Sequence, residues 1–220
     1  MITSLLVLTA APLNVLFLGN SHTQYHNVPE LVRSIAGSAG LPMRVEMRLG
    51  AFLEDIASQG EVRTLVRSGK VDVVVMQAAK VSSSHKYVYS QTQGIALAKA
   101  ARDAGVRVVL FSEWSRQGVA ESEFIENVYR GIARESGAEI APVGRIWDKV
   151  LRQAPKLTLW SDGNHASPKG AFLAAQVLYR WITKNDEAQS TYRSDAVTPG
   201  EAKWFEQVAR ESYVAATGAG

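Results

Sequence analysis

Short apolar runs alternate with segments of helical periodicity along most of this chain, and this alternation limits the folds that it can adopt. Several runs are continuous, such as LNVLFL and VDVVVM, which is typical of strands buried on both faces. We predict strands at residues 13–18, 43–49, 71–76, 106–111 and 139–143. We predict helices at residues 28–38, 52–66, 92–104, 121–136, 145–153, 167–183 and 199–216. Strand–helix alternation of this kind predicts an α/β fold with a parallel sheet and helices on both faces.

The domain organisation follows from the length and from the first residues. A chain of 220 residues is within the range of one domain, and no linker divides it, so we expect a single domain at residues 13–220. Residues 1–12 form a short apolar stretch that ends in small residues. It is similar to the tail of a secretory signal peptide, which favours a periplasmic or secreted protein over a cytoplasmic one. The alternative is an ordinary N-terminal segment; the stretch is too short to span a bilayer.

Charge and cysteine content exclude several classes of function. The balance of 24 Lys and Arg against 21 Asp and Glu gives a net charge of +3, which is too small and dispersed to indicate nucleic-acid binding. The chain has no cysteine, so disulfides, thiolate metal sites and a cysteine nucleophile are excluded. We therefore expect a small-molecule substrate and no nucleic-acid partner.

The first strand leads into a loop that carries a candidate nucleophile. Ligand sites in parallel α/β sheets lie at the carboxyl ends of the strands. Gly19 allows a sharp turn there, which places Ser21 at the mouth of the sheet. Ser21 could equally cap the next helix. The loop lacks the glycines and the lysine of a phosphate-binding loop.

A second polar segment, WSDGNHASP, stands just before the predicted helix at residues 167–183. Asp162 and His165 are three positions apart across a Gly-Asn turn, so the carboxylate can reach one ring nitrogen while the other faces the cleft. A serine needs an adjacent base to become a nucleophile, and an imidazole needs a carboxylate to set its tautomer. We predict Ser21 as nucleophile, His165 as general base and Asp162 as the residue that orients it.

These two segments resemble a known family. LFLGNSHT and DGNHASPKG are similar to the first and last blocks of the SGNH (GDSL-like) hydrolases, in the branch that has Gly-Asn-Ser in place of Gly-Asp-Ser. The resemblance covers about residues 13–183. It implies a three-layer αβα sandwich with a five-stranded parallel, flavodoxin-like sheet. It also implies ester hydrolysis through an acyl-enzyme, without a cofactor.

The family resemblance also implies an oxyanion hole. The family uses the N–H of the nucleophile, a glycine N–H after the second strand and a side-chain amide after the third, and these match Ser21, Gly50 and Gln77. The third block departs from the common Gly-x-Asn-Asp pattern, because here the strand runs into MQAA. Gly50 could instead serve a simple turn, and the Gln77 amide could merely pin the following loop.

Further polar and aromatic residues lie near the same sheet edge. His22 could line the acyl pocket beside Ser21. We expect no metal site, because Pro29 puts the helix start after both His22 and His26, so the two do not share a helical face. Trp114 could stack on a sugar ring or wall the cleft, and Arg116 could hold an anionic group or tie loops together.

Residues 78–90, which include His85, form a long polar segment that could be a lid, a substrate wall or a mobile surface loop. No long apolar lid is visible, so we expect a serine hydrolase for small acyl groups, such as acetyl esters of carbohydrates. One enzymatic alternative is a thioesterase or lysophospholipase. The altered third block leaves open a non-catalytic carbohydrate-binding domain.

Overall fold

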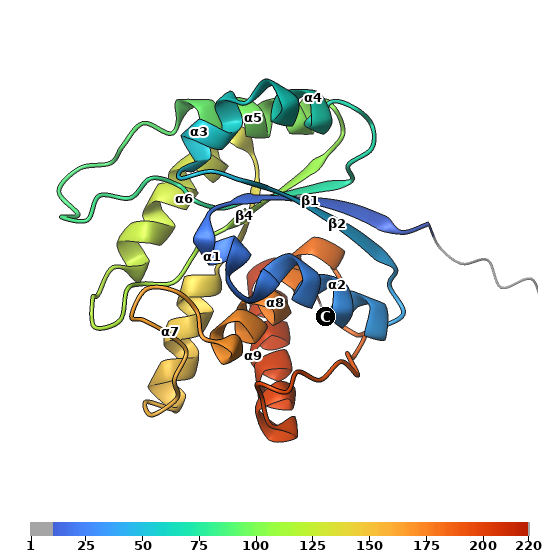
Figure 1. The fold of residues 1–220 in the computed structure, drawn as a ribbon, viewed down its shortest axis with the longest axis vertical. Helices are drawn as coiled ribbons and strands as arrows, with labels where there is room; N and C mark the ends of the chain where they lie inside the picture. The colour runs from blue at the N-terminus through green and yellow to red at the C-terminus, as the bar shows by residue number, and fades with distance from the viewer. Residues whose placement is uncertain (1–10, 220) are drawn as a thin grey trace, which may run out of the picture.

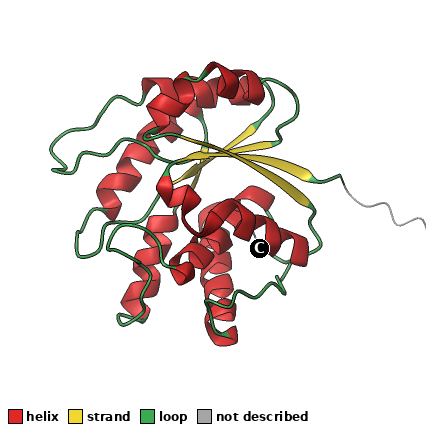
Figure 2. Ribbon diagram, viewed as in Figure 1, coloured by secondary structure: helices red, strands yellow, loops and turns green. Residues whose placement is uncertain are grey.

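The computed structural model describes residues 11–219, and these residues form a five-stranded sheet with helices on both faces (Figures 1 and 2). Neighbouring strands all pair in parallel, in the order β2-β1-β3-β4-β5. The strands are β1 (Leu13–Gly19), β2 (Met43–Leu49), β3 (Val73–Met76), β4 (Arg107–Phe111) and β5 (Glu139–Ala141). The predicted α/β fold with a five-stranded, flavodoxin-like parallel sheet is confirmed.

The helices make the two outer layers. They are α1 (Ser21–Gln24), the short 3-10 helix η1 (Tyr25–Asn27), α2 (Val28–Ser38), α3 (Leu53–Ser58), α4 (Gly60–Val66), α5 (Thr92–Asp103), α6 (Ser122–Ser136), α7 (Val143–Gln153), α8 (Pro168–Thr183) and α9 (Pro199–Thr217). Figure 1 shows α3, α4, α5 and α6 over one face of the sheet and α2, α7, α8 and α9 over the other. Thr198 caps α9, and its hydroxyl accepts the Glu201 N–H.

The core consists of two apolar clusters, one on each face of the sheet. Successive strand side chains point to opposite faces. In β1, Val15 and Phe17 therefore pack toward α2 and α8, while Leu16 and Leu18 pack toward α3 and α5. This two-sided burial explains why the predicted strands are continuous apolar runs.

The structure differs from the predicted elements in several places. The strand predicted at residues 139–143 ends at Ala141, and Val143 begins α7, which was predicted from residue 145. The helix predicted at residues 52–66 is broken at Gln59, whose backbone is extended (φ −69°, ψ 124°), into α3 and α4. Ile56 and Val62 nevertheless face the same core cluster, which explains the continuous apolar pattern. The short α1 and η1 were not predicted. Most of the apolar stretch at residues 1–12 lies outside the described residues.

Candidate active site

The loop after β1 places Ser21 at the centre of the sheet edge. β1 lies between β2 and β3, where the order of the strands reverses. Asn20 has an extended backbone and caps α1, because its side-chain oxygen accepts the His22 N–H at 3.0 Å. Only glycine fits at position 19, since a Cβ there would lie 2.2 Å from Thr23 Oγ1 and 2.6 Å from Gln77 Oε1.

The structure brings together the three residues that were predicted to form the catalytic group. His165 Nε2 lies 2.9 Å from Ser21 Oγ, although the two residues are 144 positions apart. His165 Nδ1 lies 2.7 Å from Asp162 Oδ2. The other carboxylate oxygen of Asp162 accepts the backbone N–H groups of His165 and Asn164, at 2.7 and 2.9 Å. The hydrogen bonds from the His165 ring and from these two backbone groups hold the pKa of Asp162 well below its usual range.

Two aromatic rings surround the imidazole of His165. The half-exposed Tyr25 stacks on it, with ring centroids 4.5 Å apart and an interplanar angle of 20°. His22 meets it edge-on at 5.6 Å. Burial, with the neighbouring His165, lowers the pKa of His22 to about 4, so His22 is neutral at pH 7. The contact with Tyr25 was not predicted, because no sequence pattern connects two residues so far apart.

Gln77 is placed differently from the prediction. Its side chain is fully buried, and Oε1 accepts both the Asn20 N–H and the Thr23 hydroxyl at 2.9 Å. Its Nε2 donates to the carboxylate of Glu113. The amide group therefore points away from an oxyanion at Ser21, and its oxygen rather than its nitrogen faces the nucleophile loop.

Gly50 also differs from its predicted role. Its N–H donates to the Gly19 carbonyl at 3.0 Å, which extends the β1–β2 ladder by one bond. This N–H is therefore already used within the sheet. The Ser21 N–H, at the first position of α1, has no acceptor in the described part of the chain, so of the three predicted oxyanion donors it is the one left available.

A cavity of about 220 Å³ opens beside Ser21. Asn20, His22 and Asn164, the chain neighbours of Ser21 and His165, form one part of its lining. The apolar part of the lining comes from Phe52, Ala79, Val81, Trp114 and Ile125. The remaining polar lining comes from Ser82, Ser83, Glu113, Arg116 and Glu121.

Trp114 is a wall of this cavity and not an open stacking platform. It is 2% exposed, stacks on Trp147 at 4.6 Å and packs against His22 at 4.9 Å. Its indole N–H donates to the Asn164 carbonyl at 2.9 Å, which ties the end of β4 to the segment that carries His165. The suggestion that it stacks on a sugar is therefore not supported.

Arg116 is paired with Glu121 and does not present a free cation. Its Nε and Nη2 donate to the two oxygens of Glu121 at 2.9 and 2.7 Å, and its backbone N–H donates at 2.8 Å. His85 Nε2 lies 2.9 Å from the same carboxylate. Burial alone would raise the pKa of Glu121, but the hydrogen bonds from Arg116 outweigh it and lower that pKa to about 2. Glu121 thus anchors the segment at residues 78–90 to the start of α6.

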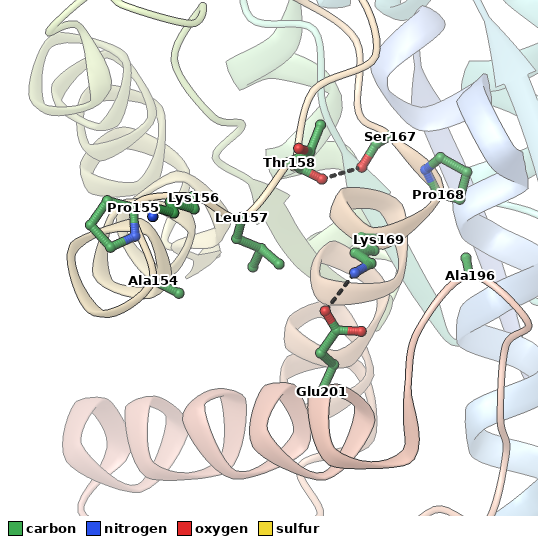
Figure 3. Close-up of a pocket in the computed structure, with 10 residues that line it drawn as sticks. All are labelled: Ala154, Pro155, Lys156, Leu157, Thr158, Ser167, Pro168, Lys169, Ala196 and Glu201. Carbon is green, nitrogen blue, oxygen red and sulfur yellow. Dashed lines mark hydrogen bonds and ion pairs between the residues drawn. The ribbon is translucent and has the colours of Figure 1, made fainter.

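Metal binding and a second, larger cavity are the other features to consider in the described residues. Among residues 11–219, no group of three or more His, Cys, Asp or Glu side chains could hold a metal ion. A larger cavity, of about 870 Å³, lies between the end of α7 and the starts of α8 and α9. Figure 3 shows Lys156 in its lining and two interactions between other lining groups, an ion pair between Lys169 and Glu201 and a hydrogen bond from Ser167 to the Thr158 carbonyl. The only hydroxyl groups in this lining belong to Thr158 and Ser167, and neither has an imidazole beside it.

Within the part of the chain that the structure describes, no helix is both long enough and apolar enough to cross a bilayer.

Comparison with known proteins gives a likeness of structure. No protein-family model matches the chain, and no curated protein sequence matches it. A protein from Slackia heliotrinireducens, assigned to the SGNH hydrolases, is 26% identical with a TM-score of 0.57; the match covers 77% of this chain and 98% of that one. A DUF4886 family protein from Bacteroides uniformis is 14% identical, with a TM-score of 0.70 and coverage of 93% and 95%.

A third similar structure is Axe2, an acetylxylan esterase from Geobacillus stearothermophilus. It is 18% identical, with a TM-score of 0.60 and coverage of 79% and 95%. At 14% and 18% identity, the second and third structures establish a shared fold alone. This chain therefore shares its fold with all three structures, and at 26% identity it is similar to the first of them, which is assigned to the SGNH hydrolases.

Proposed function

We propose that this protein is a serine hydrolase that cleaves carboxylic esters through an acyl-enzyme. The observation that carries the proposal is the continuous hydrogen-bonded series from Asp162 to His165 to Ser21, with distances of 2.7 and 2.9 Å. With the Asp162 carboxylate accepting from Nδ1, the free lone pair of the imidazole lies on Nε2, which faces the serine hydroxyl.

The reaction proceeds in two halves. Ser21 Oγ attacks the ester carbonyl carbon while its proton moves to His165 Nε2. The tetrahedral intermediate then expels the alcohol, whose oxygen takes that proton, and leaves the acyl group on Ser21. A water molecule next gives a proton to Nε2 and attacks the acyl carbon. Ser21 recovers its proton and the carboxylic acid is released.

Charge on the carbonyl oxygen needs a donor during both halves. The Ser21 N–H is the donor that we propose, since it has no acceptor in the described residues and belongs to the nucleophile itself. One such donor contributes about 3 kcal/mol to the transition state. With Gly50 and Gln77 hydrogen-bonded elsewhere, we expect a slower enzyme than one with three free donors.

The substrate that we propose is a short-chain ester, with acetyl esters of carbohydrates as the first candidates. A cavity of about 220 Å³ beside Ser21 suits a small acyl group and is too small for a long lipid chain. The likeness to the acetylxylan esterase adds support. A thioesterase or lysophospholipase for long acyl chains is disfavoured by the same cavity.

Ester hydrolysis and serine labelling test this proposal together. We expect the purified protein to hydrolyse p-nitrophenyl acetate faster than p-nitrophenyl octanoate, and a fluorophosphonate to label it at Ser21. Ser21→Ala should lower turnover by at least about 1,000-fold and abolish labelling. Ser83→Ala is the matched control, because Ser83 lines the cavity next to Ser21 and makes no hydrogen bond to a histidine ring among the described residues. A Ser21→Ala variant that hydrolyses esters at the wild-type rate would refute the assignment.

A further inference from the structure

A buried polar network lies directly beneath the Ser21 loop, and its central member is Gln77. Its Oε1 accepts two hydrogen bonds from that loop: the Asn20 N–H and the Thr23 hydroxyl, both at 2.9 Å. These two residues flank Ser21 and His22 on either side. A single amide oxygen therefore holds both ends of the segment that carries the nucleophile.

The opposite end of the Gln77 amide is held by Glu113. Nε2 of Gln77 donates to Glu113 Oε2, and the Tyr129 hydroxyl donates to the same oxygen at 3.0 Å. Tyr129 in turn accepts the Ala79 N–H at 3.2 Å. Glu113 is 8% exposed, and α7 packs tightly on its backbone, since a Cβ on Gly144 would lie 2.3 Å from the Glu113 carbonyl oxygen. The acid is thus fixed in place from α6 and from α7.

Glu113 decides which way the Gln77 amide faces. An amide side chain can rotate by 180° and exchange its donor and acceptor ends. In the exchanged orientation, Nε2 would face the Asn20 N–H, so two donors would meet in a buried site and the Asn20 N–H would lose its acceptor. A buried donor without an acceptor is unfavourable, so this orientation is disfavoured. A carboxylate at position 113 offers only acceptors, so it stabilises the observed orientation alone.

We propose that Glu113 is a positioning residue that, through Gln77, holds the start of α1 and directs the Ser21 hydroxyl toward His165. This inference rests on the proposed function, because it concerns the reactivity of the same serine. It assigns a role to a buried acid that the proton transfers of the reaction do not use. It also replaces the predicted oxyanion role of Gln77 with a structural one.

The test measures how fast a fluorophosphonate reacts with Ser21 at pH 8 in four variants. Glu113→Leu removes the acceptor. Glu113→Gln keeps an acceptor oxygen for Gln77 and Tyr129. Gln77→Glu places two carboxylates side by side. The double variant Gln77→Glu/Glu113→Gln exchanges the two groups, so the carboxylate at 77 again accepts from Asn20 and Thr23 while the amide at 113 donates to it.

Gln176→Leu is the control for the loss of a buried polar side chain. Gln176 is 1% exposed in α8, and none of the hydrogen bonds of the network involves it. The titratable or charged groups around Glu113 are Tyr129 and Glu121 from α6 and its entry, and His22 and Arg116 on the cavity wall. None of the variants changes these surrounding groups. Differences in the rate of fluorophosphonate labelling at pH 8 therefore report on the substitutions at positions 77 and 113.

We expect Glu113→Leu and Gln77→Glu to react about 10- to 100-fold more slowly than wild type, because small displacements of a nucleophile have effects of this size. Glu113→Gln and Gln176→Leu should stay within about threefold of wild type. The double variant should recover at least about tenfold over Gln77→Glu alone. If Gln77→Glu had only damaged the fold, a second substitution would not restore the rate. Recovery in the double variant therefore indicates that a specific hydrogen-bond pattern has been restored.

Two results would overturn the inference: a wild-type rate in Glu113→Leu, or a double variant as slow as Gln77→Glu. If Glu113→Leu fails to fold, as judged by circular dichroism, the comparison of Gln77→Glu with the double variant decides the question. Absence of labelling in the wild-type protein is a different result, because it refutes the proposed function itself.

Discussion

The imidazole of His165 has a neighbour on its exposed face that the sequence does not reveal. Asp162 and Ser21 hold its two ring nitrogens, and Tyr25 covers the ring with a stacked contact at 4.5 Å. Tyr25 lies in η1, where His26 and Asn27 have left-handed backbones that turn the chain toward α2. The contact thus depends on a local turn that no periodic pattern indicates.

Tyr25 should stabilise the productive ring orientation of His165. An aromatic pair contributes about 0.5–1.5 kcal/mol, so Tyr25→Ala should lower kcat/KM for p-nitrophenyl acetate by about 2- to 10-fold. Tyr25→Phe keeps the ring and is the matched control, with an expected change of less than twofold. Equal losses in the two variants would show that the hydroxyl, and not the stacking, is what matters.

The sequence predicts the role of a single residue where that role depends on residues only a few positions away in the chain. Asp162 and His165 are three positions apart, and their contact is a local turn. Gly50 and Gln77 were placed beside the site correctly, but the direction of their N–H groups was not predictable. That direction depends on the β1–β2 register for Gly50 and on Glu113, 36 positions away, for Gln77.

Helices and strands were predicted best where they are long and where residues such as proline and glycine mark their ends. The helix at residues 28–38 and the strand at residues 43–49 have the predicted bounds, because Pro29 and Gly40 mark the helix ends and alternation marks the strand. The four-residue α1 and the three-residue η1 are too short for a period to be visible. The break at Gln59 was missed because apolar spacing continues across it.

The segment at residues 78–90 has no helix or strand, and Glu121 is one of its polar anchors, beside the Leu53 N–H, the Tyr129 hydroxyl and the Gln91 amide. Glu121 is buried and joins His85 of this segment and Arg116 of the β4 loop to the start of α6. Glu121→Ala removes all of these bonds, and a hydrogen bond to a charged group contributes about 1.5–3 kcal/mol. Local opening of the segment should then increase, because its population follows the local free energy.

We therefore expect trypsin to cleave Glu121→Ala at Lys80 and Lys86 at least about tenfold faster than wild type, as followed by mass spectrometry. Glu123→Ala is the control, because Glu123 is exposed two positions after Glu121, in the first turn of α6, and no ion pair involves it among the described residues. Cleavage at equal rates in the two variants would mean that contacts other than Glu121 hold the segment.

At the scale of the whole molecule, the sheet order converts distant chain positions into one site. β1 and β3 are interior strands, and β2 lies on the opposite side of β1 from β3. The loops after β1, β3 and β4 therefore lie at one edge of the sheet, where they meet the segment before α8. The alternation of strands and helices predicted a parallel sheet. The order of its strands came from the family resemblance, because apolar periodicity carries no information on which strands are neighbours.

The buried Glu113 makes the free energy of unfolding depend on pH, and comparison with a variant at this position measures its contribution separately. Burial, opposed by the hydrogen bonds from Gln77 and Tyr129, raises the pKa of Glu113 to about 7. The unfolded chain has the ordinary pKa near 4.5, so between pH 4.5 and 7 the folded state retains a proton that the unfolded state releases. The contribution of Glu113 to stability is therefore full below pH 4.5 and is lost as the pH rises toward 7.

Urea unfolding of wild type and Glu113→Gln from pH 4.5 to 8 measures this contribution. Glutamine does not titrate, so the stability of wild type relative to the variant should fall by roughly 3 kcal/mol across that range, at about 1.4 kcal/mol per pKa unit. His22 also titrates, with a pKa lowered to about 4, but it is present in both proteins and cancels in the difference. Two parallel stability curves would mean that the folded protein holds Glu113 at an ordinary pKa, so that the hydrogen bonds from Gln77 and Tyr129 fully offset the effect of its burial.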